Sequence, residues 1–542
     1  MPWRWRGKVA RFDSFGIVVT PRTGETASRR PAVCVERTGD GSVELPDCIR
    51  VLEDGRVVAT RDRMGLGTIR YAVSPSGELL LSDSTAWLAA RLGLVTLDVR
   101  SISEHLTYRY VSGTRTLFRE ISSVPAGYRV IFDEGYPARG GAALERALPF
   151  IWGRQDLMPL AEVCRSFEEE LSRQTLRLSE GSGCLFFSGG LDSSLVASLY
   201  GERPAAITAG VDEEAYDECP RAERAAALLG LGWSGARVSE GSFLEILRRA
   251  VCLSGGTLPV EQIVSNQLLA ESFSPSGPVL AGYGADFLFG EGQRKYWAVF
   301  RLGRITGMAT LQMALGLYGL TGGRQRQQSL TARGFVRRLS EGDTWIDMMP
   351  ALDPPCDPGI AVRSLGLESL PDFHEHRRRM LTDEMPPHLT QRVFVTYSNL
   401  ISDTVSCWSR LMGSAGCELR LPFLSQPIVD LVCGLDPRSY LRVMSRKPVI
   451  SAMASRRLPG AILGLPKMSG SLPVWRWIVS PAGGFGAVLD RLASRNFMDL
   501  GPSRDSLRAS ERYGYIPLWA AVNLELLIEH VEEHGARVRG LS

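Results

Sequence analysis

The chain of 542 residues contains very little lysine: only four of its 62 basic residues are lysines. They are Lys8, Lys295, Lys447 and Lys467, and every other basic residue is arginine. Basic and acidic residues nearly balance, with a net charge of +3, which argues against a nucleic-acid binder that works through bulk charge. Because arginine is the default cation here, each remaining lysine is informative.

Metal-binding, disulfide and targeting patterns are also missing. None of the ten cysteines forms a CxxC pair, and the six histidines show no HExxH motif. Idle thiols of this kind indicate a reducing cytosol. No apolar signal core follows the basic N-terminus. The most hydrophobic window, Ile305 to Leu320, is too short to span a bilayer and predicts a pair of buried helices. We therefore expect a cytoplasmic protein without a membrane or nucleic-acid partner.

The length predicts two domains. Residues 1–135 favour an α+β domain, with short strands at Phe15–Thr20, Arg56–Thr60, Ile69–Val73 and Leu79–Leu81 and helices at Ser84–Leu92 and Ile102–Tyr108. The glycine-containing stretch 136–157 is interpreted as a linker. In residues 158–542, amphipathic helices alternate with short apolar runs, a pattern typical of an α/β domain with a parallel sheet.

The most informative motif lies between Cys184 and Tyr200, where an apolar run is followed by SGGLDSS and a helical pattern. A strand, a glycine-rich turn and a helix N-terminus together form an anion site. No GxxxxGK[ST] or GxGxxG motif is present. SGGLDSS instead resembles the pyrophosphate loop of N-type ATP pyrophosphatases. That resemblance implies ATP binding by Ser188, Gly189, Gly190, Asp192 and Ser193.

A second apolar run, beginning at Val279, ends in the glycine-rich sequence Ala281-Gly282-Tyr283-Gly284-Ala285-Asp286. Ala281 and Gly282 are further candidates for ATP contact. Asp192 and Asp286 both follow strands of the expected parallel sheet, so they should meet at one edge of it. Two carboxylates there suit Mg²⁺ bridging ATP phosphates, because hard cations prefer oxygen ligands.

Residues 158–480 resemble the synthetase domain of the asparagine synthetase family. Cys417–Leu424 is similar to its VEVRVPFL segment, and the stretch around Lys467 is similar to its late RPKxGF segment, whose lysine contacts the reacting phosphates. Near the front, Thr60–Gly65 resembles ARDRLG and Tyr110–Phe118 resembles YVPGPRTLF. The resemblance implies an N-terminal Ntn-hydrolase-like domain and a C-terminal PP-loop (adenine-nucleotide α-hydrolase) synthetase domain, with ATP and Mg²⁺ required.

The N-terminus departs from that family. Its glutaminase nucleophile is a cysteine at position 2, but this chain has Pro2, and its first cysteine is Cys34. We therefore expect no glutaminase activity. Two branches of the family lack this cysteine: the β-lactam synthetases and the cyclases that form the isopeptide ring of lasso peptides.

Tyr283 resembles the tyrosine of the β-lactam synthetase GYGAD loop, which pairs with a glutamate from a later helix. Simple register places that glutamate near Ser406, and Asp403 is the nearest acid. Tyr283, Asp403 and Lys467 are thus the candidate catalytic residues. The tail, Gly514–Asn523 and the helix after it, looks more like the lasso cyclases. This favours a lasso cyclase over a β-lactam synthetase, an amidotransferase using free ammonia, or a non-catalytic ATP-binding scaffold.

On this hypothesis a side-chain carboxylate of a precursor peptide is adenylated, and the peptide's own amine then closes the ring. The implied partners are that precursor, a leader-peptide-binding protein and a leader peptidase. Residues 291–400 are expected to hold the peptide. For lysine, we expect Lys467→Arg to impair turnover and Lys447→Arg to be milder, since arginine is a wide planar fork and lysine a compact point charge.

Overall fold

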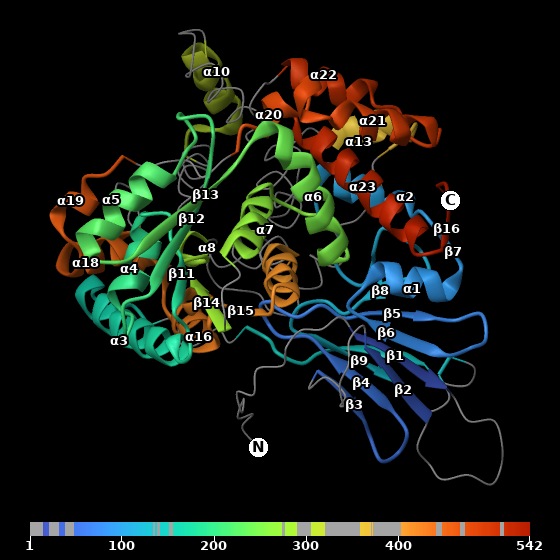
Figure 1. The fold of residues 1–542 in the computed structure, drawn as a ribbon, viewed down its shortest axis with the longest axis horizontal. Helices are drawn as coiled ribbons and strands as arrows, with labels where there is room; N and C mark the ends of the chain where they lie inside the picture. Colours follow the sequence, from blue (N-terminus) through green and yellow to red (C-terminus); the bar gives the residue numbers. More distant parts are fainter. Residues whose placement is uncertain are drawn as a thin grey trace.

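The computed structural model describes residues 15–20, 32–37, 48–133, 136–137, 141–150, 156–273, 277–289, 305–319, 358–369, 371, 403–440, 447–466, 472–509 and 514–541. These residues form a mixed α/β structure in which antiparallel sheets come first in the chain and a parallel sheet follows. Figure 1 shows the antiparallel strands at one end of the molecule and the parallel sheet, surrounded by helices, at the other.

Two antiparallel sheets make up the N-terminal part. One has the order β2-β1-β6-β5-β8, with β1 Phe15–Thr20, β2 Ala32–Arg37, β5 Arg70–Val73, β6 Leu79–Ser82 and β8 Ser122–Ser123. The other has the order β10-β9-β4-β3, with β3 Ile49–Val51, β4 Val57–Thr60, β9 Tyr128–Phe132 and β10 Ala142–Arg146. Apolar side chains from both sheets, including Ile17, Leu81 and Val130, form one buried cluster. The sheets therefore pack face to face.

Strand β1 is buried on both faces because a helix covers its other side. Ile17 and Val19 belong to the cluster between the sheets, whereas Val18 belongs to the larger core of the molecule. Helix α1 (Thr85–Leu92) places Trp87 so close to Gly16 that a β-carbon there would lie 2.3 Å from the indole. The strands and helices expected around residues 15–108 are present to within a few residues, with α2 running from Val99 to Tyr108.

The expected linker 136–157 is wrong in part, because it contains a strand. β10 (Ala142–Arg146) pairs antiparallel with β9, with Leu144 opposite Val130. Its sequence, AALER, has no β-branched residue and so carries no local strand signal. Pairing with a neighbouring strand, rather than intrinsic propensity, makes this segment extended.

The second sheet system is fully parallel, with the order β13-β12-β11-β14-β15. Its strands are β11 Cys184–Phe186, β12 Ala205–Val211, β13 Trp233–Val238, β14 Gly277–Ala281 and β15 Cys417–Arg420. Helix α3 (Leu160–Ser179) precedes β11, and the helices between the strands up to β14 are α4 Leu191–Ser198, α5 Cys219–Leu229, α6 Glu240–Ser254 and α7 Gln262–Phe273. The chain runs outward from β11 to β13 and then returns to β14 on the other side of β11. Ligands bind in parallel sheets of this kind at such a point of reversal.

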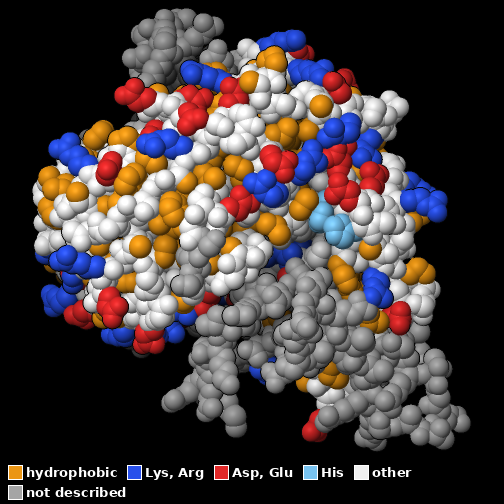
Figure 2. All heavy atoms as spheres, in the orientation of Figure 1, with side chains coloured by type: hydrophobic (Ala, Val, Ile, Leu, Met, Phe, Trp, Pro, Cys, Tyr) orange, Lys and Arg blue, Asp and Glu red, His pale blue; other side chains and the backbone are white. Residues whose placement is uncertain are grey.

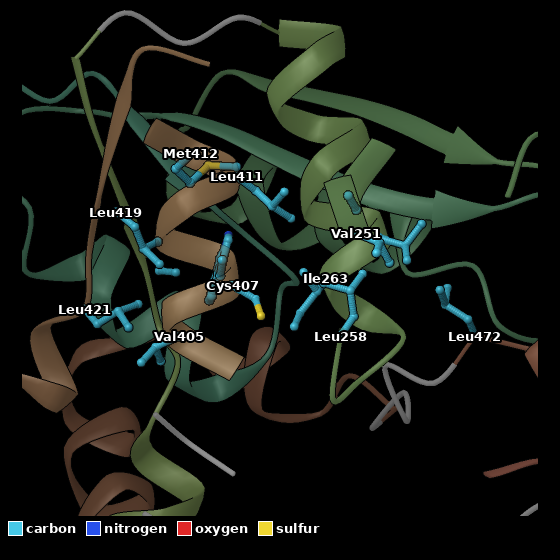
Figure 3. Close-up of a cluster of buried hydrophobic side chains, with 14 of the residues drawn as sticks. Val251, Leu258, Ile263, Val405, Cys407, Leu411, Met412, Leu419, Leu421 and Leu472 are labelled. Carbon is cyan, nitrogen blue, oxygen red and sulfur yellow. The ribbon is translucent and has the colours of Figure 1, made fainter. Parts of the chain in front are cut away.

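In the described part of the chain, the remaining α-helices follow β14, most of them after β15. They are α8 Ala285–Leu288, α10 Met308–Gly319, α13 Pro358–Ser364, α16 Gln426–Gly434, α17 Pro437–Tyr440, α18 Pro448–Arg457, α19 Gly460–Leu463, α20 Val474–Trp477, α21 Phe485–Ser494, α22 Gly501–Ala509 and α23 Ile516–Glu533. Residues 403–414 are also helical. Figure 3 shows this helix in the core, between Leu419 and Leu421 on one side and Val251 and Ile263 on the other.

The C-terminus returns to the N-terminal part of the chain. The short strand β16 (Arg537–Arg539) pairs parallel with β7 (Leu94–Thr96). Helix α23 is almost wholly buried. The imidazole Nε2 of His105 in α2 is hydrogen-bonded to the carbonyl oxygen of Ala520 in α23, at 3.1 Å. The two parts of the molecule are therefore connected by more than the chain between them.

The expectation of buried helices at Ile305–Leu320 is wrong for the residues described. Helix α10 projects from the body of the molecule (Figure 1), and Ile305, Met313 and Leu317 are 78%, 69% and 68% exposed. The mean hydropathy of a segment does not specify what the segment packs against, so an apolar sequence alone does not predict burial. Within the described chain, no helix has the length and apolar character needed to cross a bilayer. Acidic and basic side chains are interspersed on the face shown in Figure 2.

Candidate active site at the reversal point of the parallel sheet

The SGG loop joins β11 to α4 and leaves helix amides uncapped. Gly190 is the N-cap residue of α4 and has no side chain that could accept a first-turn N–H. Ser188 Oγ accepts a 3.3 Å hydrogen bond from the Gly190 amide, and Ser193 Oγ donates one of 3.2 Å to the Gly190 carbonyl. The loop is thus held by its own serines. An anion bound there would receive N–H groups from the start of the helix.

The loop after β14 packs directly against this helix start. A β-carbon on Gly282 would lie 2.8 Å from the amide nitrogen of Ser193, so only glycine fits. Gly284 has a φ of +112°, which favours glycine, and its α-carbon hydrogens face Leu424, 2.5 Å from the position of a β-carbon. The structure therefore brings Gly282 beside Ser193.

Two carboxylates and one lysine meet at this edge. The Lys447 ammonium lies 2.5 Å from Oδ2 of Asp192 and 2.5 Å from Oδ1 of Asp286. Lys447 precedes α18 with a left-handed backbone (φ 44°), and its side chain is only 8% exposed. Burial disfavours its charge, but the two carboxylates outweigh burial and raise the pKa of Lys447 above its usual range. The lysine therefore stays protonated.

The donor set fits a Mg²⁺ ion that also contacts phosphates. Oδ1 of Asp192 is buried and, within the described chain, has no hydrogen-bond partner. A carboxylate oxygen that is both buried and unsatisfied suits a cation ligand. The described residues contain no cluster of three His, Cys, Asp or Glu side chains that could hold a metal. Phosphate oxygens and water would therefore supply the other ligands.

Tyr283 points toward the helix at residues 403–414. Its ring meets Trp408 edge-on, with centroids 5.9 Å apart, and Thr404 lies one turn before Trp408 on the same helix face. Burial raises the pKa of Tyr283 well above its usual range, and the nearby charges of Asp286 and Arg109 act in opposite directions on it. Arg109 ends α2, so the N-terminal part of the chain contributes a charge near Tyr283.

Asp403 lies on a different face of that helix from Thr404. Burial raises the pKa of Asp403 to about 6, against the opposing charges of Arg61 and Arg70 from the N-terminal part. Ser406, the register position of the expected glutamate, accepts a 2.9 Å hydrogen bond from Thr68. No hydrogen bond or ion pair between described residues joins Asp403 to Tyr283. The helix thus presents Thr404 and Trp408, not an acid, to the tyrosine.

Lys467 lies outside the described residues, so its expected place at the site stays a prediction. The lysine that the structure places at the carboxylates is Lys447. The rarity of lysine in this chain was the available signal, and the choice between the two lysines relied on a motif resemblance alone. Arg109 and Arg221, the latter beside the SGG loop, carried no signal among so many arginines.

A family model described as asparagine synthase matches residues 165–529, more than half of the chain. The chain belongs to the asparagine synthase family. Members of this family have a PP-loop synthetase fold and are ATP-dependent ligases, which accounts for the SGG loop at the reversal point of the sheet. The family resemblance of the second part of the chain is thereby confirmed. No curated protein matches the chain.

Proposed function

We propose that this protein is an ATP-dependent amide ligase that closes the macrolactam ring of a lasso peptide. A side-chain carboxylate of the peptide, from Asp or Glu, is adenylated, and the N-terminal amine of the same peptide then forms the amide. The observation that carries the ATP chemistry is the meeting of Asp192, Asp286 and Lys447 beside the SGG loop. The absence of a cysteine at position 2 supports an amine that comes from the substrate itself.

In the first step the carboxylate oxygen forms a bond to the α-phosphorus of ATP. The bond from that phosphorus to the bridging oxygen breaks, and the oxygen leaves with the electron pair as pyrophosphate. Amides from Ser188 to Ser193 bind this leaving group. Asp192 and Asp286 would hold Mg²⁺, which would supply positive charge at this site. Lys447 adds a compact ammonium that can pair with phosphate oxygens.

In the second step the amine forms a C–N bond with the acyl carbon, the bond to the AMP oxygen breaks, and the amine loses a proton. An α-amino group has an ordinary pKa of about 7.7–8.0, so a useful fraction is neutral without a strong base. On the helix at 403–414, Tyr283 faces Trp408 and not a carboxylate that could act as a base. Positioning of the folded peptide then supplies most of the acceleration.

The rest of the proposal concerns the setting of this reaction. The N-terminal part serves as an Ntn-type, glutaminase-like domain that has lost its nucleophile and keeps a structural role. The protein acts in the cytoplasm with a leader-peptide-binding protein and a leader peptidase. The charges of Arg61 and Arg70 near Asp403 support a structural connection between the two parts.

ATP–pyrophosphate exchange with synthetic core peptides tests the proposal. A peptide with a free N-terminal amine and a ring-closing Asp or Glu should support exchange and yield a product lighter by one water, with AMP released. The N-acetylated peptide should support exchange but not cyclise. The matching Asn or Gln peptide should support neither.

Other outcomes would favour the alternatives. Exchange with a small β-amino acid, and none with peptides, would indicate a β-lactam synthetase-type cyclase. Amide formation from free ammonia would indicate an amidotransferase. ATP binding without exchange on any carboxylate would indicate a scaffold subunit.

A further inference from the structure

An arginine that the sequence did not single out lies against the SGG loop. Arg221 is the third residue of α5, which follows the carboxyl end of β12. Its Nη2 atom lies 3.7 Å from the point that a β-carbon on Gly190 would occupy. Its carbonyl oxygen lies 3.0 Å from the corresponding point on Gly189, so the backbone of α5 and its guanidinium both border the loop.

This guanidinium lacks the partners that comparable arginines have. Arg221 Nε is buried without a hydrogen-bond partner, and no carboxylate of the described residues lies within ion-pair distance of the side chain. By contrast, Arg410 pairs with Asp83 and donates to the Leu253 carbonyl, and Arg420 pairs with Glu418. A half-buried guanidinium with a buried, unmet Nε–H, next to an anion loop, has the chemistry of an anion ligand.

The acid at the start of the same helix does not satisfy this arginine. Glu218, one turn earlier on the helix, acts on Arg221 only through its charge, and burial nonetheless lowers the pKa of Arg221. Burial also raises the pKa of Glu218. For both groups, the pKa shift caused by burial is therefore larger than the opposite shift caused by the charge of the other group.

We infer that Arg221 binds the terminal phosphates of ATP and the pyrophosphate formed from them. This inference rests on the proposed cleavage of ATP between its α and β phosphates. As the bridging oxygen leaves, negative charge builds on the pyrophosphate, and the planar guanidinium offers two parallel N–H donors to its oxygens. Two cations from distant elements, Arg221 of α5 and Lys447 before α18, then stabilise one leaving group.

Calorimetric titration with three ligands in the presence of Mg²⁺ tests this inference: inorganic pyrophosphate, ATP and AMP. Arg221→Ala should weaken pyrophosphate and ATP binding by about tenfold or more, the range expected for a lost charge-assisted hydrogen bond. AMP, which lacks the terminal phosphates, should bind as to the wild type. Arg224→Ala removes an exposed arginine from the same helix and should leave all three affinities unchanged.

Each contrary outcome has a distinct meaning. Pyrophosphate and ATP affinities of Arg221→Ala equal to those of Arg224→Ala would overturn the role of Arg221 alone. Equal weakening of AMP would show a general effect on the site and would also overturn it. A wild-type protein that binds neither ATP nor pyrophosphate would overturn the proposed function together with the inference. Arg221→Lys should recover part of the pyrophosphate affinity, whereas a merely structural guanidinium would not respond in a ligand-selective way.

Discussion

Lys447 donates a 2.5 Å hydrogen bond from its ammonium to Oδ2 of Asp192, a residue 255 positions earlier in the chain. The same ammonium contacts Asp286, so one lysine pairs with both carboxylates of the candidate metal site. Without it, two neighbouring negative charges would repel each other at this edge of the sheet. This lysine therefore holds the site together in the absence of nucleotide and becomes available to phosphates in its presence.

Replacing Lys447 should abolish most of the adenylation activity. We expect Lys447→Ala to reduce ATP–pyrophosphate exchange by about 10²-fold or more, comparable to the loss of one donor to a developing anion. Lys447→Arg should also be impaired, because a planar guanidinium cannot take the ammonium's place between two carboxylates. The sequence alone predicted a milder effect for Lys447→Arg than for Lys467→Arg. Because Lys447 contacts both acids, we now expect Lys447→Arg to be impaired as well. Arg457→Ala, on the same helix but paired with Glu168, is the control, and near-wild-type exchange by Lys447→Ala would contradict the assignment.

Asp192→Asn and Asp286→Asn should each remove activity while the protein still folds. Asn keeps the volume of the side chain but removes the charge that attracts Mg²⁺. The concentration of Mg²⁺ required for half-maximal exchange should rise steeply in both variants. Asp212→Asn changes an exposed carboxylate just after β12 and should behave as the wild type. An unchanged Mg²⁺ dependence in Asp192→Asn would refute the metal site.

Lys467 remains a predicted catalytic residue on the strength of its motif. We expect Lys467→Ala to cost on the order of 3 kcal/mol of transition-state stabilisation. Lys467→Arg should also be badly impaired, since a compact charge is required. Steady-state turnover of both variants measures this. Full activity of Lys467→Ala would remove the residue from the active site, and full activity of Lys467→Arg would show that charge alone suffices.

His105 should make the contact between α2 and α23 sensitive to acid. It is fully buried, and burial lowers its pKa to about 4, below the ordinary value of 6.5. Folding therefore favours its neutral form. The contribution of neutral His105 to the free energy of unfolding is complete above pH 6.5 and is lost as the pH falls toward 4. The free energy of unfolding lost in this way should approach about 3 kcal/mol. Between pH 7.5 and 4.5, the thermal unfolding temperature should fall less steeply for His105→Gln than for the wild type. The control His534→Gln, at an exposed site, should behave as the wild type. Equal slopes for His105→Gln and the wild type would contradict this prediction.

Glutamine should not serve as a nitrogen source. With Pro2 in place of a cysteine, removal of Met1 would expose a secondary amine and no thiol. Incubation with glutamine, ATP and Mg²⁺ should release no glutamate above background. Glutamate release coupled to ATP consumption would show that another residue has taken over the nucleophile's role.

The parts of the fold that were predicted well depend on local signals. SGGLDSS and GYGAD place their strand, turn and helix within a few residues, and glycines at 189, 282 and 284 meet steric demands that other residues could not. Strand β10 and helix α10 were misjudged for the opposite reason. AALER is extended only because β9 pairs with it, and α10 is exposed although its sequence is apolar.

The sequence by itself determined the chemistry available to this protein: a phosphate-binding turn, two carboxylates after parallel strands, scarce lysines and no cysteine at position 2. Only the tertiary structure decided which groups meet. It placed Lys447 on both carboxylates, Thr404 rather than Asp403 beside Tyr283, and Arg221 against the SGG loop. These contacts join residues from distant helices and strands. Periodicity and motifs describe only neighbours along the chain, whereas the packing of the whole chain sets distances across the sheet.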